Sequence, residues 1–451
     1  MTMPEKHTIF TFIMLKFATR MQPVFISIIP ALAWVLFLYF LAWQTSVFGS
    51  ERRHKAWFMV LFGMKIAMGM AVWAIYTFHY TDRQTSDIYR FFADSEVVYH
   101  ALFEHPQHYL QLVTGIGGNA AEHQPYFEAM NNWYKSFDDG FVNENRTLIR
   151  INALLMPLTM GSYFGNMVII CFLGVWAQAF LYRQLLKHFT GIPLLLFAAI
   201  NLWPSQLFWT SALMKEPLVM IGIAVSLGAA LRLKEKTSVP TFILLLAGVW
   251  LTLFSKFYIG IALCFPLLAF LLGKEGLSIR KSAINYGIAL GMLILSVWGV
   301  GKLGPRFDIP MIISAKQHAF TNVANATQAG SAFYITKLEP TLPSMLRLSP
   351  EGTANSLLRP FPQDSKGLME WAAVAENILF IVVAIFLLVK RNPGSPHFSL
   401  AFSLLLFGLI ILVLGGITVN ISGALVRYKM PAIPYLTLAL LMVSKLNNVK
   451  V

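Results

Sequence analysis

The chain has 451 residues, of which 57% are hydrophobic, 14% are aromatic and only 12% are charged. Soluble domains carry roughly 25% charged residues, so this composition excludes an ordinary soluble protein. The formal net charge of +14 does not indicate nucleic-acid binding. The basic residues lie in short clusters between apolar runs, which is typical of the cytoplasmic loops of membrane proteins.

Eleven apolar runs approach the ~20 residues that cross a bilayer. They lie near residues 24–44, 56–78, 163–183, 192–210, 217–233, 239–255, 257–273, 282–300, 373–389, 398–419 and 429–445. They predict an all-α polytopic membrane protein with about 11 transmembrane helices. Residues 1–22 form either an interfacial helix on the outer side or another crossing. The first run leads directly into a full-length span, so we expect no cleaved signal.

Charge predicts the orientation of these spans. Six short connections each carry a net charge of +2, at 45–55, 183–191, 232–238, 274–281, 390–397 and 445–451. Positive loops stay in the cytoplasm, so we expect the C-terminus inside and two long loops, 79–162 and 301–372, outside. Five regions result: 1–78 with the first two spans, the loop 79–162, a bundle 163–300 broken at 201–217, the loop 301–372, and the last spans 373–451.

The two outer loops differ in charge. Residues 79–147 contain ten acids against four bases, and five of the ten histidines, whereas 301–372 contains seven bases against five acids. Loops of this length in a compact protein are usually functional. An acidic loop and a basic loop suit a reaction that needs a proton acceptor and an anionic leaving group. Charges that only keep two loops in water would give the same pattern.

The first outer loop opens with an amphipathic pattern over residues 85–109. Its apolar residues recur at helical spacing, which predicts a helix lying on the membrane surface. Asp87, Arg90 and Asp94 fall on the opposite stripe. An acid close behind a span can act as a general base, so Asp87 and Asp94 are candidate catalytic residues, supported by Arg90. Alternatively, these residues form an internal ion pair worth a few tenths of a kcal/mol.

Further along the same loop, His105 and His108 have a spacing compatible with a metal ion. Two histidines alone do not make a site, so we assign no metal ligand. A divalent metal ion remains open as a cofactor.

The segment 201–217, NLWPSQLFWTSALMKEP, interrupts an apolar region with two prolines. Lys215 and Glu216 lie where the chain re-enters the membrane, and charged groups at such depth indicate function. A Lys–Glu pair closing the turn would explain them equally well. Lys256 falls at the outer end of a span, where it can meet a phosphate. Lys65 lies inside a span, either paired or snorkelling.

Three arginines at the outer face are candidates for binding a donor phosphate: Arg347, Arg359 and Arg427. Arg359 precedes Pro360 in an apolar setting, and a rigidly held guanidinium suits bidentate phosphate binding. Arg427 is followed by Tyr428 and Lys429, which we expect to support it. Ordinary interfacial anchoring would also account for these three residues.

The chain resembles the GT-C superfamily of polytopic glycosyltransferases. The resemblance lies in the acidic first outer loop with Asp87, in the turn FWTSALMKE from Phe208, and in RYKMPAIPYL from Arg427. The last run is similar to protein mannosyltransferase-like and aminoarabinose transferase-like members. FWTSALMKE and RPFP, at 359–362, also resemble a group of uncharacterised bacterial membrane proteins. The chain departs from the superfamily because a span at 24–44 precedes the first loop, and because it has no paired-Asp metal motif.

This resemblance implies a GT-C-like fold and a role for Asp87 in deprotonating or orienting the acceptor. We therefore expect a glycosyltransferase of the bacterial inner membrane, with its active site facing the periplasm. Its partners would be a polyprenyl-phosphate-linked sugar, membrane lipid and a glycan or lipid acceptor. Lys215, Lys256, Arg347, Arg359 and Arg427 would bind the donor phosphate. A polysaccharide polymerase or ligase, a flippase or transporter of lipid-linked sugar, and an inactive scaffold subunit are the alternatives.

Overall fold

The computed structural model describes residues 27–80, 86–134, 143–189, 191–274, 276–304 and 307–447. It is 78% helical, and these residues include no β-strand, only isolated bridges between Ala332 and Ile421 and between Arg391 and Ser444. The prediction of an all-α protein is confirmed. The predicted N-terminal segment 1–22 lies outside the described residues.

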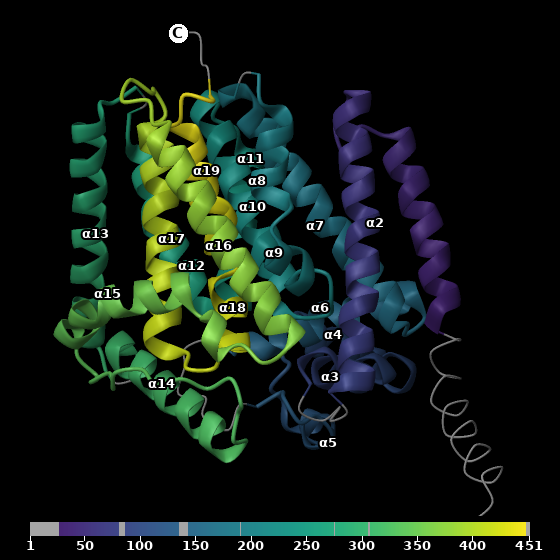
Figure 1. Ribbon diagram of the computed structural model, residues 1–451. Helices are drawn as coiled ribbons and strands as arrows, with labels where there is room; N and C mark the ends of the chain where they lie inside the picture. The colour runs from purple at the N-terminus through teal and green to yellow at the C-terminus, as the bar shows by residue number, and fades with distance from the viewer. Residues whose placement is uncertain are drawn as a thin grey trace, which may run out of the picture. The chain divides into compact units, whose positions relative to one another are not determined.

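A helix at Ser27–Gln44 precedes the labelled helices of Figure 1. Those helices are α2 Arg52–Ala74, α3 Asp87–Glu104, α4 Pro106–Thr114, α5 Gln124–Ala129, α6 Glu144–Thr159, α7 Tyr163–Leu185, α8 Pro193–Asn201, α9 Pro204–Trp209, α10 Lys215–Glu235, α11 Val239–Ser255, α12 Phe257–Leu272, α13 Ile279–Gly301, α14 Ile309–Ala326, α15 Leu342–Leu358, α16 Leu368–Val389, α17 Phe398–Thr418, α18 Ser422–Lys429 and α19 Ala432–Met442. A π-helical turn, Ile75–His79, extends α2.

Seven helices of the described residues are long and apolar enough to cross a membrane, and each coincides with a predicted span. They are Ser27–Gln44, Arg52–His79, Tyr163–His188, Lys215–Glu235, Ile279–Gly301, Leu368–Val389 and Phe398–Thr418. A polytopic helical membrane protein is therefore the class that the structure supports. The predicted spans 239–255, 257–273 and 429–445 correspond to the shorter apolar helices α11, α12 and α19.

The run at 192–210, predicted as one span, is instead two short helices, α8 and α9. The break falls at Leu202 and Trp203, immediately before Pro204 at the start of α9. Proline lacks an N–H and disfavours helical geometry in the residue before it, so α8 cannot continue through this point. The prediction of a break within 201–217 is confirmed, and that of a continuous span at 192–210 is wrong.

The chain divides into two compact units. Unit 1 comprises Met1–Tyr134, Asn145–Val175 and Ser211–Met214, and unit 2 comprises Lys135–Glu144, Trp176–Thr210 and Lys215–Val451.

Unit 1 combines apolar helices with the first predicted outer loop. The Tyr39 hydroxyl donates to the Met59 carbonyl at 3.1 Å and ties the first helix to α2. The predicted amphipathic helix is α3, whose buried residues include Ile88, Phe91 and Val98. Its apolar face is therefore confirmed.

In unit 2, small residues allow two helices to approach closely. Gly222 and Ser226 of α10 face Gly248 and Thr252 of α11, and a Cβ on Gly222 would lie 2.8 Å from the Gly248 carbonyl oxygen. Such small-residue contacts are a usual way to pack helices in membranes, because backbones can then touch.

The segment 301–372 of unit 2 carries two helices, α14 and α15. Both lie across the end of the unit near α18 (Figure 1). The Gln317 amide of α14 donates to the carbonyls of Thr336 and Ile417 at 2.9 and 2.8 Å, which fixes α14 beside the end of α17. This end of unit 2 holds most of the predicted cationic site residues.

Candidate functional site

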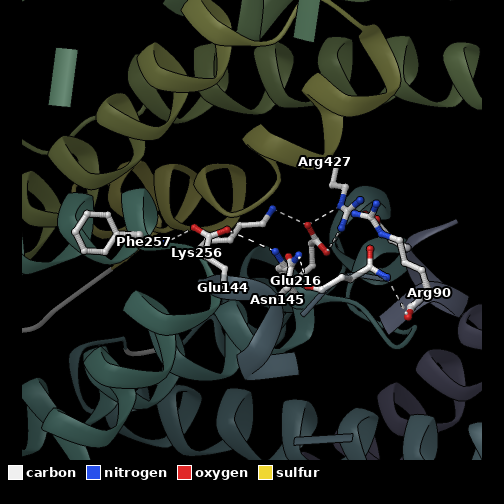
Figure 2. A network of polar contacts seen from close by, with 10 residues as sticks. Arg90, Glu144, Asn145, Glu216, Lys256, Phe257 and Arg427 are labelled. Atoms are coloured by element: carbon white, nitrogen blue, oxygen red, sulfur yellow. Dashed lines mark hydrogen bonds and ion pairs between the residues drawn. The ribbon is translucent and has the colours of Figure 1, made fainter. Parts of the chain in front are cut away.

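The centre of the site is the buried carboxylate of Glu216 at the start of α10, only 1% exposed. Its oxygens accept hydrogen bonds from Arg427 Nε at 2.5 Å, Arg427 Nη2 at 2.8 Å and Lys256 Nζ at 2.6 Å. Figure 2 shows this carboxylate between the Lys256 ammonium and the Arg427 guanidinium. The bidentate fork is the strongest geometry available to an Arg–carboxylate pair. Lys215 and Glu216, which the sequence offered as a possible mutual pair, belong to separate ion pairs. Lys215 lies against Glu144, and Glu216 binds Lys256 and Arg427.

The local sequence explains how these groups meet. Lys256 is the extended residue, with φ −150° and ψ 98°, that ends α11 and begins α12. The chain turns there, and the lysine side chain is 6% exposed. Arg427 lies in the last turn of the short helix α18. Glu216, in the first turn of α10, also benefits from the positive end of that helix.

A second carboxylate, Glu144, belongs to the same group. It lies 3.6 Å from Lys215 Nζ and accepts the backbone N–H of Phe257 at 2.8 Å (Figure 2). Phe257 is the first residue of α12, whose N–H has no partner within the helix. Glu144 therefore caps α12 while it holds Lys215.

Two stacked tyrosine rings contact a further cation of the site, Lys316. The rings of Tyr258 and Tyr428 stack with centroids 5.8 Å apart and 6° between planes. Lys316 of α14 lies over both, at 4.4 and 5.0 Å from the centroids, and Lys256 lies 4.7 Å from the Tyr428 ring. Cation–π contacts of this kind hold an ammonium group without neutralising it.

The group contains more positive than negative charge. Four cations, Lys215, Lys256, Lys316 and Arg427, surround two carboxylates. Lys316 has no carboxylate within ion-pair distance among the described residues. Burial lowers the pKa of Lys316 from its usual 10.5, and the Glu144 carboxylate opposes that change. Burial also raises the pKa of Tyr428 to about 12, so its hydroxyl stays protonated at neutral pH. We call these four cations and two carboxylates the cation cluster.

Two predicted phosphate-binding arginines lie outside the cation cluster. The Arg359 guanidinium contacts Asp364 and Asn355, both at 3.3 Å, and lies 4.3 Å from the Phe333 ring. Arg347 is exposed on α15. Among the described residues, the structure gives neither guanidinium a contact with Glu216 or Glu144.

Lys429, predicted to support the phosphate site, is buried and ties three helices together. Its ammonium donates to the Ser356 and Arg359 carbonyls at 2.7 and 3.2 Å and to Asn377 Oδ1 at 2.5 Å. These three acceptors match the three N–H bonds of an ammonium. Its contacts are those of a structural residue at the end of α18.

The proposed general base Asp87 lies in unit 1, in the first turn of α3. Its carboxylate is 2.6 Å from Arg90, and both side chains are partly exposed, at 21% and 35%. The ion pair anticipated from the spacing is therefore present.

Asp94 does not lie on an exposed stripe, which corrects that part of the prediction. It is 2% exposed, and its two oxygens accept the backbone N–H groups of Asn131 and Asn132 at 3.0 and 2.8 Å. Burial raises the pKa of Asp94, and these hydrogen bonds oppose the change. The helical stripe is interrupted here because the turn after α5 folds over α3. Asp94 fixes that turn.

Lys65, in the apolar helix α2 of unit 1, is 4% exposed. It faces α7, where a Cβ on Gly174 would lie 4.0 Å from its Nζ.

The residues of the described chain that are arranged to hold a metal ion are His108, Glu122 and His123. Of the predicted pair, only His108 takes part, since His105 is exposed and outside this group.

Glu144, Lys316 and Tyr258 are the residues of the site that the sequence did not single out. Lys316 had no signal of its own, since it is one of seven bases in its predicted loop. Glu144 had none, since it is one of ten acids in its loop. No family model, curated protein or solved structure matches this chain. We therefore infer its function from the site.

Proposed function

We propose that this chain is a membrane glycosyltransferase that takes a sugar from a polyprenyl-phosphate donor. The single observation that supports this most strongly is the cation cluster, where four cations meet two carboxylates at one end of unit 2. We further propose a GT-C-like arrangement of helices in a bacterial inner membrane, with this end facing the periplasm.

An excess of positive charge suits a phosphate ligand. Arg427 and Lys256 are both held by the Glu216 carboxylate, so their positions are set before a ligand arrives. Preorganised cations stabilise developing negative charge more effectively than mobile ones. Lys316 rests on aromatic rings, and it is the cation best able to gain a phosphate oxygen as partner.

The proposed reaction transfers the sugar from the lipid phosphate to an acceptor hydroxyl. The bond between the sugar C1 and the phosphate oxygen breaks, and a bond between C1 and an acceptor oxygen forms. The lipid phosphate leaves with the electron pair, and the cations of unit 2 stabilise it. The acceptor's proton passes to a carboxylate, a role that we assign to Asp87. A glycan or another lipid would serve as acceptor.

A lipid-linked donor also needs an apolar surface. A groove of about 310 Å³ lies between α12 and α13, lined by Phe265, Leu268, Ala269, Leu272, Met292, Leu295 and Ser296. Phe265 is eight residues beyond Phe257, or about 12 Å along α12. A polyprenyl tail leaving the cation cluster along α12 would reach this groove.

A transporter of lipid-linked sugar is the second candidate, and Lys65 is the observation that favours it. A lysine buried within a membrane helix is costly and usually functional. Because a transporter moves its substrate intact, chemical turnover distinguishes the two functions.

The experiment is a transfer assay with purified protein in lipid nanodiscs. Polyprenyl-phosphate and polyprenyl-pyrophosphate donors carrying radiolabelled sugars are supplied with lipid and glycan acceptors. We expect labelled acceptor and free lipid phosphate. Intact donor throughout the panel, together with donor movement across vesicle membranes, would instead establish transport.

A further inference from the structure

A second group of ionisable side chains lies in unit 1 and takes no part in the proposed reaction. His108 comes from α4, and Glu122 and His123 come from the 3₁₀ turn Ala121–His123. One ligand atom from each lies within 4.8 Å of the others. The exposed fractions of these side chains are 22%, 53% and 0%.

The distances within this group are too long for direct hydrogen bonds. Glu122 Oε1 is 3.9 Å from His108 Nε2 and 3.8 Å from His123 Nε2. A hydrogen bond of this type spans 2.7–3.2 Å. Around a tetrahedral Zn²⁺ with bonds of about 2.0–2.1 Å, neighbouring ligand atoms are about 3.3 Å apart. The three ligand atoms lie within 4.8 Å of one another, so they must approach by up to about 1.5 Å to share one ion.

The surroundings of His108 favour the same interpretation. Its Nδ1 lies 3.4 Å from the Tyr126 hydroxyl. A proton on Nδ1 would leave the Nε2 lone pair directed at Glu122 and His123. Histidines that bind metals usually donate the other ring N–H to a neighbouring acceptor in this way. The Tyr126 hydroxyl, at 3.4 Å, would need to move only slightly closer to accept that proton and orient the ring.

His123 is the most deeply buried of the three side chains. Its Nε2 lies 2.9 Å from Gln111 Oε1, and its Nδ1 has no hydrogen-bond partner within the described residues. To bind an ion, His123 Nε2 would exchange its contact with the Gln111 oxygen for the metal, and the ring proton would move to Nδ1.

We propose that His108, Glu122 and His123 form a binding site for one divalent transition-metal ion, with Zn²⁺ as the best fit. Two imidazoles and one carboxylate are ligands that Zn²⁺ accepts, and they leave a fourth position for water. The ion would join α4 to the turn before α5. This inference does not depend on the proposed glycosyltransferase activity.

The test measures Zn²⁺ binding to the full-length protein in detergent, purified without a histidine tag and stripped with a chelator. Competition against a coloured chelator gives the dissociation constant, and Co²⁺ absorption reports tetrahedral coordination. We expect one equivalent in the wild type and at least about tenfold weaker binding in His108→Gln and Glu122→Gln.

Two variants control for charge and histidine content. Glu128→Gln removes a nearby acid of α5 that pairs with Gln124, and His100→Gln removes an exposed histidine of α3. Both should bind like the wild type. Glu122 is half exposed, so Glu122→Gln should fold even if His108→Gln does not. Absence of stoichiometric binding in the wild type, or equal affinity in Glu122→Gln and Glu128→Gln, would overturn the proposal.

Discussion

Asp94 of unit 1 and Glu216 of unit 2 are both buried carboxylates, and they are satisfied in different ways. In unit 1, Asp94 accepts two backbone N–H groups, which are neutral donors. In unit 2, Glu216 is bound by Arg427 and Lys256, which are full charges. The first arrangement fixes a turn and adds no charge beyond the acid's own. The second arrangement places the charged side chains of Lys256 and Arg427 in the protein interior, where burying a charge costs free energy.

The contrast shows which buried acid indicates function. A buried charge is expensive unless it is paired and hydrogen-bonded. Asp94 meets that need locally, so its presence is explained by the fold. Glu216 also meets it, but at the expense of bringing further charges into the interior. Lys316 nearby has no carboxylate within ion-pair distance among the described residues, and a ligand anion would supply its counter-charge.

The largest effect is expected in unit 1, at the partly exposed Asp87 and not at the buried Asp94. Asp87→Asn should lower the transfer rate by about 10²–10⁴-fold, the usual contribution of a general base. Its thermal unfolding should stay near wild type, since a partly exposed pair with Arg90 is worth about 0–1 kcal/mol. Transfer rates and unfolding curves of the purified variant check both statements. Wild-type turnover in Asp87→Asn would exclude it as the base.

Glu216→Gln in unit 2 should give the largest loss of stability. It leaves Arg427 and Lys256 buried without their counter-charge, and breaking a buried pair costs about 3–5 kcal/mol. The matched control is Glu235→Gln at the other end of α10. The pair of Glu235 with Lys187 is half exposed, so its loss should cost less than ~1 kcal/mol. Equal unfolding midpoints for the two variants would contradict the account of the cluster.

Asp94→Asn should have a smaller effect, confined to stability. The amide keeps one acceptor oxygen, so one of the Asn131 and Asn132 N–H groups loses its partner. A buried donor without a partner costs about 1–3 kcal/mol. The transfer rate per folded molecule should be unchanged. A rate loss without a shift in unfolding would move the catalytic carboxylate from Asp87 to Asp94.

The smallest expected effect is the change of donor affinity with pH at the cation cluster of unit 2. Anion binding needs a charged Lys316, and burial lowers the pKa of this lysine from 10.5. Affinity for the donor should therefore fall with rising pH before 10.5 is reached. Lys316→Arg carries a guanidinium that does not titrate, so it should bind well and lose this alkaline decline. Dissociation constants measured between pH 7 and 10 give the comparison, and identical profiles would remove Lys316 from the site.

The sequence predicts the helices better than the contacts between them. Runs of apolar residues located seven long helices, because a bilayer imposes the length of its spans. The break before α9 was visible because Pro204 acts locally. The pairing of Glu216 with Arg427 joins residues 211 positions apart, and no local pattern encodes it. Asp94 was misplaced because helical periodicity does not show which later segment, here Asn131 and Asn132, folds back over a helix.

The central claim is that the cation cluster of unit 2 binds a lipid phosphate, and direct binding tests it without requiring turnover. Polyprenyl phosphate is titrated into wild type, Lys316→Gln and Lys337→Gln in nanodiscs. Lys337 is an exposed lysine of the same predicted loop and serves as the control. We expect Lys316→Gln to bind about tenfold more weakly, or about 1.4 kcal/mol, and Lys337→Gln to bind like wild type. Equal affinities in all three proteins would contradict the claim.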